Sequence, residues 1–357
     1  MSFFWAFSAF AALILLHEFG HFIAAKAVGM RVERFSLFFP PVLAKIQRGE
    51  TSYEIGAIPL GGFVKITGMS PDEEIEPGVL SRAYHLQPVW KRVVTIAAGP
   101  LMNILIAIVL IFILFAFIGI SETSPKIESV DKNAAAAGKI QPGDAIRSVN
   151  GVTGDPIVFV EELNKTKCAG GSTKDGCPAA RPARVVIERG GQPRSFAATP
   201  RYDAENERMR LGLTFANVSV TEPAGEAFTH TFSAIWRVTK ITFSLPARVF
   251  DPEKRKEISS AVGGYEQTRQ AFENSTERTV GIIALISLSL AIINLFPFLP
   301  LDGGHIFWAL AEKMSGRKIP IMVLERASMI GIALVVMLFV IGFTNDIDRF
   351  RNGGFGQ

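Results

Sequence analysis

Cysteine is almost absent from this chain of 357 residues, which contains only two. That number excludes a disulfide-rich scaffold and a cysteine-rich zinc module. Charge is also sparse: charged residues make up 20% of the chain, and 37 basic against 33 acidic residues leave a net charge of +4. So small an excess does not favour a nucleic-acid partner. Hydrophobic residues make up 48% of the chain, which excludes a disordered protein, and their distribution carries the information.

Three segments have no charged residue over a length that suits a membrane. They are residues 93–120, 279–301 and 327–343, or 28, 23 and 17 residues in turn. A helix needs about 20 apolar residues to cross the hydrocarbon core of a bilayer. We therefore expect transmembrane helices over 91–120, 279–306 and 319–344.

The first 27 residues form a fourth apolar block, interrupted only by His17, Glu18 and His21 before Lys26. A secretory signal begins with a basic region and ends with a cleavable small-residue site. No lysine or arginine precedes Lys26. We therefore interpret residues 1–27 as a retained first transmembrane helix.

Basic residues indicate how the four helices are oriented. Segment 26–92 carries nine lysines and arginines, whereas the opposite flanks carry mainly Glu122, Glu277, Arg278, Asp346, Asp348 and Arg349. Segment 302–320 adds Lys313, Arg317 and Lys318 to the basic side. By the positive-inside rule, both basic segments lie in the cytoplasm of a plasma or inner membrane. Both termini and residues 121–278 then lie outside.

The long external segment contains two kinds of sequence. Residues 126–130 and 183–188 alternate like strands, residues 158–163 suit a short helix, and glycines mark the turns, so 121–220 predicts a small α+β domain. Cys168 and Cys177 in this domain could close a disulfide loop outside the cytoplasm, or remain free thiols. Residues 221–278 include aromatic residues at helical spacing with basic residues between them, which favours an amphipathic interfacial region. A soluble amphipathic core helix is the alternative.

His17, Glu18 and His21 form the pattern H-E-x-x-H inside the first apolar block. On a helix, residues four apart share a face, so both imidazoles can bind one metal ion while Glu18 reaches the attacking water. Charged groups inside a membrane are costly and are usually functional. The alternative is a pair of histidines that hydrogen-bond between helices beside a protonated glutamate.

Catalytic zinc typically takes three protein ligands, so the chain must supply one more. Asp302 follows Pro297 and Pro300, which interrupt a helix, and precedes Gly303 and Gly304, which we expect to permit the return path of the chain. A broken third helix could bring Asp302 to the depth of His17. A plain helix end at the membrane surface is the alternative, and His305 could compete as the third ligand.

These motifs resemble the site-2 protease family (peptidase M50), and within it the bacterial RseP-like enzymes. The matching stretches are HEFGH at 17–21, GAIPLGGFVK at 56–65, GPLMN at 99–103, and NLFPFLPLDGGH at 294–305. The resemblance implies that His17, His21 and Asp302 bind Zn²⁺ and that Glu18 is the catalytic general base. It also implies that Asn294 lies near the substrate.

The resemblance has further implications for the segments outside the helices. Residues 28–90 would contain a membrane-embedded β-hairpin whose edge receives unwound substrate as an added strand, which places Gly61, Gly62 and Phe63 at the substrate. The alternative is an ordinary cytoplasmic hairpin. The pattern around residues 134–151 is similar to a bacterial PDZ domain, in one copy where well-known members have two. Because this chain has one copy, the resemblance does not imply that two PDZ domains select substrates by size.

The sequence thus predicts a multi-pass α-helical membrane protein with four transmembrane helices, a membrane-associated β-hairpin and one extracytoplasmic PDZ-like domain. Its expected function is that of an intramembrane zinc metalloprotease that cleaves single-span membrane proteins. By resemblance, the substrates are anti-sigma factors or signal-peptide remnants, and the PDZ-like domain could bind a peptide or protein. The alternatives are a non-catalytic PDZ-bearing scaffold, which would not need Glu18, and an ion or proton transporter, which would normally show paired repeats.

Overall fold

The structure is a computed structural model that describes residues 1–69, 73–132, 134–171, 174–256 and 258–351. It divides into two compact units, each treated by itself below. The first unit combines Met1–Ile118 with Glu222–Gln357, and the second is Gly119–Thr221.

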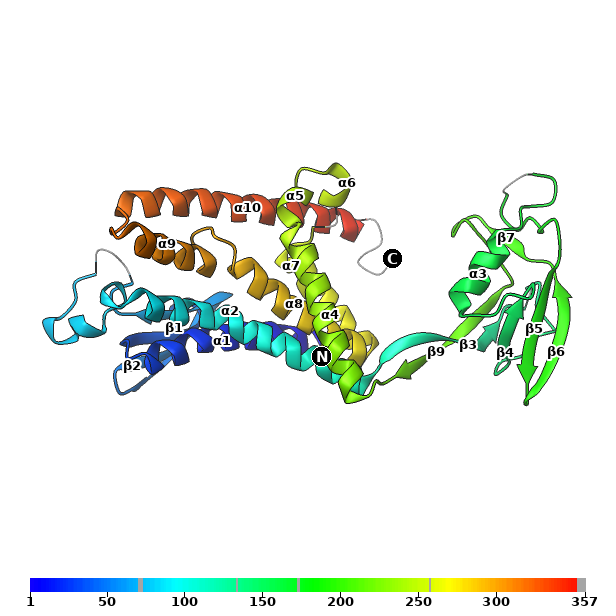
Figure 1. The fold of residues 1–357 in the computed structure, drawn as a ribbon, viewed down its shortest axis with the longest axis horizontal. Helices are drawn as coiled ribbons and strands as arrows, with labels where there is room; N and C mark the ends of the chain where they lie inside the picture. Colours follow the sequence, from blue (N-terminus) through cyan, green and yellow to red (C-terminus); the bar gives the residue numbers. More distant parts are fainter. Residues whose placement is uncertain (70–72, 133, 172–173, 257, 352–357) are drawn as a thin grey trace. The chain divides into compact units, whose positions relative to one another are not determined.

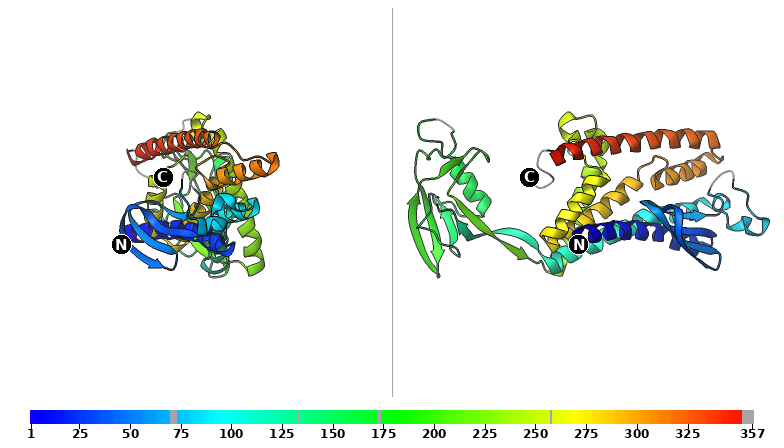
Figure 2. Two further views of the ribbon diagram at one scale, coloured as in Figure 1. Left: turned by 90° about the vertical axis from the view of Figure 1, so that its left-hand side faces the viewer. Right: turned by 180° about the vertical axis from the view of Figure 1, so that it is seen from behind.

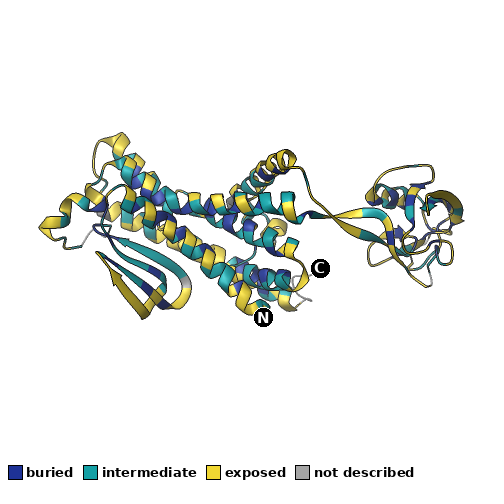
Figure 3. Cartoon of the chain, turned by 90° about the horizontal axis from the view of Figure 1, so that it is seen from below, coloured by how far each residue is buried: buried dark blue, intermediate teal, exposed yellow. Residues whose placement is uncertain are grey.

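Four helices of the first unit are long and apolar enough to cross a membrane (Figure 1). They are α1 (Ser2–Ala27), α2 (Val89–Ile113, continued by η3, Leu114–Ile118), α8 (Thr276–Asn294) and α10 (Ile321–Arg351). The four helices expected from the sequence are therefore present. Their outer surfaces carry many exposed residues (Figure 3), and on α10 these are hydrophobic over most of its length, as suits contact with lipid.

Helices α1 and α8 pack closely on α2. A Cβ atom added to Gly20 of α1 would overlap the backbone of Ala98, so only glycine permits this approach. On another side of α2, Ser287 of α8 donates a hydrogen bond of 2.9 Å to the carbonyl of Asn103. Both α1 and α8 are therefore fixed to α2.

Contacts at the helix ends define the relative directions of α1 and α8. The hydroxyl of Ser2 donates to Glu273 (2.7 Å), and Tyr265 donates to the carbonyl of Phe3 (3.0 Å). Both partners belong to α7 (Ala261–Asn274), which leads directly into α8. Hence α1 and α8 begin at the same end of the unit and run in the same direction, as the right-hand view of Figure 2 shows.

The expected two-stranded hairpin is more elaborate in the structure. Residues 34–37 of β1 (Val32–Arg48) pair with 62–65 of β2 (Thr51–Ile66) on one side and with 52–55 on the other. Residues 42–48 also pair with 51–56, so the two bent strands form four adjacent segments. β1 bends at Pro40 and Pro41, which lack the N–H group of a continuous strand. Two short helices, η1 (Pro77–Arg82) and η2 (Tyr84–Leu86), lead on to α2.

Region 221–278, expected to be amphipathic and interfacial, forms several helices. They are α4 (Ala224–Phe243), α5 (Leu245–Arg248), α6 (Pro252–Arg255) and α7. Ile235 and Val238 of α4 pack on a core shared by α2 and α8, whereas Phe228, Phe232 and Trp236 are exposed. One face of α4 therefore belongs to the helix bundle and the other remains available to solvent or lipid.

Asp346, which the sequence places on a charged external flank, is buried in the structure. It is 1% exposed and accepts hydrogen bonds from the hydroxyls of Ser259 and Ser260 and from the backbone N–H of Gly263. Its carboxylate thus satisfies the free N–H groups at the start of α7. This role depends on a contact between distant segments and has no signal in the local sequence.

The second unit is built on a five-stranded sheet in the order β6-β5-β4-β3-β9 (Figure 1). The strands are β3 (Ile120–Val130), β4 (Ala145–Val149), β5 (Ala183–Arg189), β6 (Gln192–Ala198) and β9 (Leu213–Val220). Helix α3 (Pro156–Asn164) contributes Phe159 and Leu163 to the core, and β7 (Arg201–Asp203) pairs with β8 (Arg208–Arg210). The unit has its own hydrophobic core around Ile127, Val149, Val185 and Ile187.

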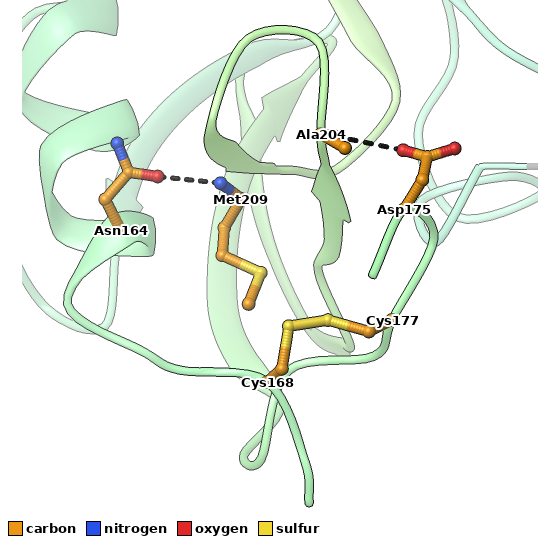
Figure 4. Close-up of a disulfide and its surroundings, with 6 residues drawn as sticks. All are labelled: Asn164, Cys168, Asp175, Cys177, Ala204 and Met209. Carbon is orange, nitrogen blue, oxygen red and sulfur yellow. Dashed lines mark hydrogen bonds between the residues drawn. A yellow bond between two sulfur atoms is a disulfide. The ribbon is translucent and has the colours of Figure 1, made fainter. Parts of the chain in front are cut away.

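Cys168 and Cys177 form a disulfide in this unit (Figure 4). On either side of it, Asn164 accepts a hydrogen bond from the backbone N–H of Met209 (2.7 Å), and Asp175 accepts one from Ala204 (3.1 Å). The cross-link closes the loop after α3 on itself, and the two hydrogen bonds tie the end of α3 and this loop to the β7–β8 hairpin. Of the two states that the spacing leaves open, the structure contains the cross-linked one.

Candidate metal centre

His17 and His21 lie on one buried face of α1, each 7% exposed. Their Nε2 atoms are 3.3 Å apart, and each Nε2 is also 3.3 Å from Oδ2 of Asp302. Residues 285 positions apart in the chain thus bring three potential ligand atoms together, as the helix periodicity and the broken third helix predict.

The chain reaches Asp302 through a break between two helices. Helix α8 ends at Asn294, ahead of Pro297, which disfavours helical backbone in the residue before it. Helix α9 (Asp302–Ser315) then begins with Asp302 itself. The third transmembrane segment, expected as a broken helix over 279–306, therefore consists of α8, an irregular stretch over 295–301 and the start of α9.

Gly303 and Gly304 have a different role from the one the sequence suggests. Both lie in the first turn of α9, and neither has a positive φ, so conformational freedom is not what they supply. A Cβ on Gly303 would overlap the backbone of Leu295, and one on Gly304 would lie 2.5 Å from the backbone of Phe298. Their small size lets the irregular stretch pack directly on α9.

The three converging atoms fit a zinc ion. Ligand atoms about 2.0 Å from a central zinc, at the corners of a tetrahedron, lie about 3.3 Å from one another. Each of the three distances between His17, His21 and Asp302 has this value. Oδ2 of Asp302 is also buried and receives no hydrogen bond from any described residue, which would be unfavourable without a cation. Three protein ligands leave a fourth position for water or substrate.

Backbone and side-chain groups of α2 orient both histidines. Nδ1 of His21 lies 2.9 Å from the carbonyl of Thr95, so Nδ1–H donates there and Nε2 is left free to bind metal. The side-chain amide of Asn103 lies 3.3 Å from Nδ1 of His17. If the amide is turned so that Oδ1 faces His17, Oδ1 accepts the Nδ1–H of His17, and His17 has the same tautomer as His21. Oδ1 of Asn103 then also gains the hydrogen-bond partner that it lacks among the described residues.

Glu18 lies beside the three ligands and next to the sheet. It is close enough to His21, His17 and Asp302 to interact electrostatically with each of them. A Cβ added to Gly62 of β2 would lie 2.9 Å from Cγ of Glu18. The structure therefore places one segment of β2 directly against the expected general base.

The other expected site residues lie around this point. Gly61 and Phe63 flank Gly62 in β2 and both contact Phe39. A Cβ on Gly61 would meet the ring of Phe39, and the ring of Phe63 stacks on it with the ring centroids 6.1 Å apart. Asn294 is the last residue of α8, seven residues before Leu301, and no hydrogen bond of its side chain is found among the described residues. His305 lies near enough to Asp302 and His21 to interact with them electrostatically. The three ligand atoms that converge come from His17, His21 and Asp302, and His305 is not among them.

Sequence reasoning missed two groups that shape this centre. The carbonyl of Thr95 leaves no trace in residue identity, because every residue has one. Asn103 could have been found, because an amide buried in an apolar helix requires a partner. It lies at the end of the stretch GPLMN, which matched the resembling family without a role for its last residue.

The sequence model of peptidase family M50 matches residues 5–338 of this chain. The chain belongs to this family. Relatives named as zinc metalloproteases include one from Campylobacter jejuni, 29% identical over 94% of this chain and 90% of its own length. Another, from Nostoc, is 30% identical over 93% of this chain and 92% of its own length. A third, from Synechocystis, is 30% identical over 88% of this chain and 86% of its own length.

The M50 family membership establishes the class of the protein. It is a membrane-embedded zinc metalloprotease of the site-2 protease type, and zinc is its cofactor. A scaffold or a transporter would not account for this membership. Among solved structures, the PDZ domain of an SdrC-like protein from Listeria monocytogenes is similar, with 13% identity and a TM-score of 0.22, over 27% of this chain and 92% of that domain.

Proposed function

We propose that this M50 protease cleaves single-span membrane proteins within or near their transmembrane segment. The observation that carries the proposal is that the ligand atoms of His17, His21 and Asp302 lie 3.3 Å from one another. The two histidines lie within α1, and Asp302 follows α8, and both helices are long and apolar enough to span a bilayer. A water-dependent site built into such segments serves a substrate that is itself in the membrane.

The residues of the site suggest how the peptide bond is hydrolysed. Zinc, when bound by these three residues, would act as a Lewis acid that polarises the scissile carbonyl and makes water more acidic. Glu18 would accept the proton of the attacking water and pass it to the leaving amine. Asn294, at the end of α8, would contact the substrate near the reacting carbonyl.

The sheet offers a place for an unwound substrate. Residues 62–65 of β2 pair with 34–37 on one side, and no described strand pairs with their other side. Gly62 in this segment lies against Glu18. A substrate segment that adds there as a strand would expose its peptide bonds beside Glu18, whereas a helix would keep them hydrogen-bonded. Gly61, Gly62 and Phe63 would then bind the substrate backbone and its side chains.

The second unit provides a candidate site for a peptide or protein ligand. Phe159 and Leu163 of α3 and Leu213 and Phe215 of β9 line a cavity. β9 is an edge strand of the sheet, so a peptide could pair with it and insert an apolar side chain into the cavity. By resemblance this is a PDZ-like domain outside the cytoplasm.

The charge distribution supports an orientation with the basic segments in the cytoplasm and both termini outside. In that orientation, α1 and α8 both run from the outside inwards, in keeping with their common direction in the structure. The metal centre would then lie near the cytoplasmic side of a plasma or inner membrane. The family resemblance points to anti-sigma factors or signal-peptide remnants as substrates, trimmed first by another protease.

The test uses the full chain in proteoliposomes with a panel of single-span substrates and metal analysis of each preparation. Wild type should contain about one zinc per chain and cleave at least one substrate in or beside its membrane segment. Glu18→Gln should keep zinc and lose cleavage by about 10²–10⁴-fold. Asp302→Ala should lose both. Cleavage unchanged in both variants would refute the proposal.

A further inference from the structure

An ion pair outside the metal centre links α2 to the helix that carries Asp302. Nη1 of Arg92, near the start of α2, lies 2.9 Å from Oε2 of Glu312 on α9. The side chains are 10% and 24% exposed, so the pair is largely removed from solvent. We propose that the Arg92–Glu312 pair is a positioning device that holds α9, and with it Asp302, in register with the two histidines.

The pair gives too little stability to explain its presence by that alone. Removing two charges from water is unfavourable, and the attraction between them offsets this cost only when the remaining polar atoms are satisfied. Nε of Arg92 is buried and has no hydrogen-bond partner among the described residues. The best-attested role of buried polar and ionic groups is to fix one arrangement of packed elements against others.

The position of the pair is suited to that role. Asp302 and Glu312 are ten residues apart on α9, which corresponds to about 15 Å along the helix. The start of α9 is held by the packing of Gly303 and Gly304 on the irregular stretch 295–299, and Ile306 packs on a core that includes Met30 and Ile96. A second anchor 15 Å away limits how far the helix can rotate or tilt. Zinc requires such a limit, because its ligands must lie within about 0.2 Å of their ideal distances.

Arg92 also connects the third ligand to the other two. Thr95, one turn further along α2, accepts the hydrogen bond from His21, and Asn103 on the same helix contacts His17. Through Arg92, α2 therefore positions both histidines of α1 and the aspartate of α9. This inference rests on the zinc site proposed above and adds a residue that touches neither metal nor substrate.

The experiment measures zinc affinity of the full chain in detergent by competition with a chelator. The variants are Arg92→Gln, Glu312→Gln, and the exchange pair Arg92→Glu and Glu312→Arg, alone and together. Arg269→Gln is the matched control, because Arg269 forms a comparable pair with Glu266 on α7, away from α9. Co²⁺-substituted protein gives a second readout, because its visible absorption is strong in a four-coordinate site and weak in a six-coordinate one.

We expect each single variant at Arg92 or Glu312 to bind zinc at least tenfold more weakly, with weaker Co²⁺ absorption, and Arg269→Gln to stay within twofold of wild type. The double exchange should recover most of the loss, which a general loss of stability would not produce. Wild-type zinc affinity in both Gln variants would overturn the inference. So would a double exchange that loses as much zinc affinity as the two single exchanges combined. Failure of wild type itself to bind zinc would instead overturn the proposed site.

Discussion

Gly99 of α2 lies directly against the imidazole ring of His21. A Cβ at position 99 would lie 2.8 Å from Cδ2 of that ring and closer still to Cε1 and Nε2. The ring is held on its other side by the hydrogen bond from Nδ1–H to the carbonyl of Thr95. His21 thus occupies a space that exists only because residue 99 has no side chain.

Gly99→Ala should therefore displace the ligand atom of His21 and weaken zinc binding at least tenfold, in the range seen when partners of metal ligands are lost. Zinc affinity of the full chain in detergent measures the effect. Gly225→Ala in α4 is the control, because nothing lies within 4 Å of a Cβ at that position. Equal zinc affinity in both variants would show that the ring can move without cost.

Asn103 provides a second test of how α2 orients the ligands. Asn103→Ala removes the group that contacts Nδ1 of His17 and should weaken zinc binding about 10- to 100-fold. Asn103→Asp keeps an acceptor and should bind zinc more tightly than the alanine variant. Ser287→Ala is the control, since the hydroxyl of Ser287 donates to the backbone carbonyl of Asn103 and not to its side chain. Equal affinity in the alanine and aspartate variants would remove this role.

The ligands themselves were predictable because they are ionisable groups in apolar segments. His17, Glu18 and His21 would be costly there without a function, and Pro297 with Pro300 predicts the break that brings Asp302 inward. The carbonyl of Thr95 was not predictable, because backbone groups carry no residue signature. Gly303 and Gly304 were assigned the wrong role, since glycine identity does not distinguish free backbone from close packing.

The double pairing of β1 with β2 could not be predicted from the sequence either. Alternating residues indicate strands but do not specify which segments pair, and a register that joins residue 35 to both 53 and 64 depends on two bends. Asp346 illustrates the same limit, because Ser260 and Gly263, whose N–H groups donate to its carboxylate, lie more than 80 residues away. Local pattern thus predicted the helices and the ligands, and long-range packing decided the rest.

In the second unit, Asp144 and Arg189 predict how stability depends on pH. Two hydrogen bonds of 2.7 Å from the Arg189 guanidinium hold the pKa of the Asp144 carboxyl below its usual range. A carboxyl with a lowered pKa in the folded state contributes stability that is complete above its unfolded pKa of about 3.9 and is lost as pH falls towards the folded value. The unit should therefore lose part of its stability below about pH 4.

Asp144→Asn should lower the urea midpoint of this unit by roughly 0.5–1 M at pH 7 and remove most of its contribution to the pH dependence. Pulse proteolysis of the full chain, with fragments from residues 119–221 identified by mass, measures the midpoint. Glu162→Gln breaks the exposed pair with Lys165 and should have a smaller effect. A variant with the wild-type slope below pH 4 would contradict the assignment.

The disulfide predicts a stability effect that leaves the metal centre unchanged. Cys168 and Cys177 close a short loop with a sequence separation of 9, which restricts the unfolded chain by about 2–3 kcal/mol. The double variant Cys168→Ser, Cys177→Ser should lower the stability of the second unit by that amount, measured by pulse proteolysis. Zinc affinity should stay within twofold of wild type. A parallel loss of zinc would show that the two units are energetically coupled.

A substitution at Gly62 should affect substrate turnover and leave metal binding unchanged. A Cβ at this position would lie 2.9 Å from Cγ of Glu18 and 2.9 Å from the carbonyl of Ser36, so Gly62→Ala should push β2 away from Glu18 without touching the zinc ligands. We expect unchanged zinc content and a tenfold or greater loss of kcat/KM, because small displacements of a reacting group are costly. The variant should also retain its Co²⁺ spectrum.

Gly61→Ala is the matched control, since a Cβ there meets the ring of Phe39 on the other side of the strand and not Glu18. If the substrate adds to residues 62–65, Gly62→Ala should lower kcat/KM much more than Gly61→Ala does. An aromatic ring can rotate away from a new methyl group, whereas the Ser36 carbonyl belongs to a paired strand and cannot move alone. Equal losses in the two variants would mean that the sheet has only a structural role and that substrate reaches Glu18 by another route.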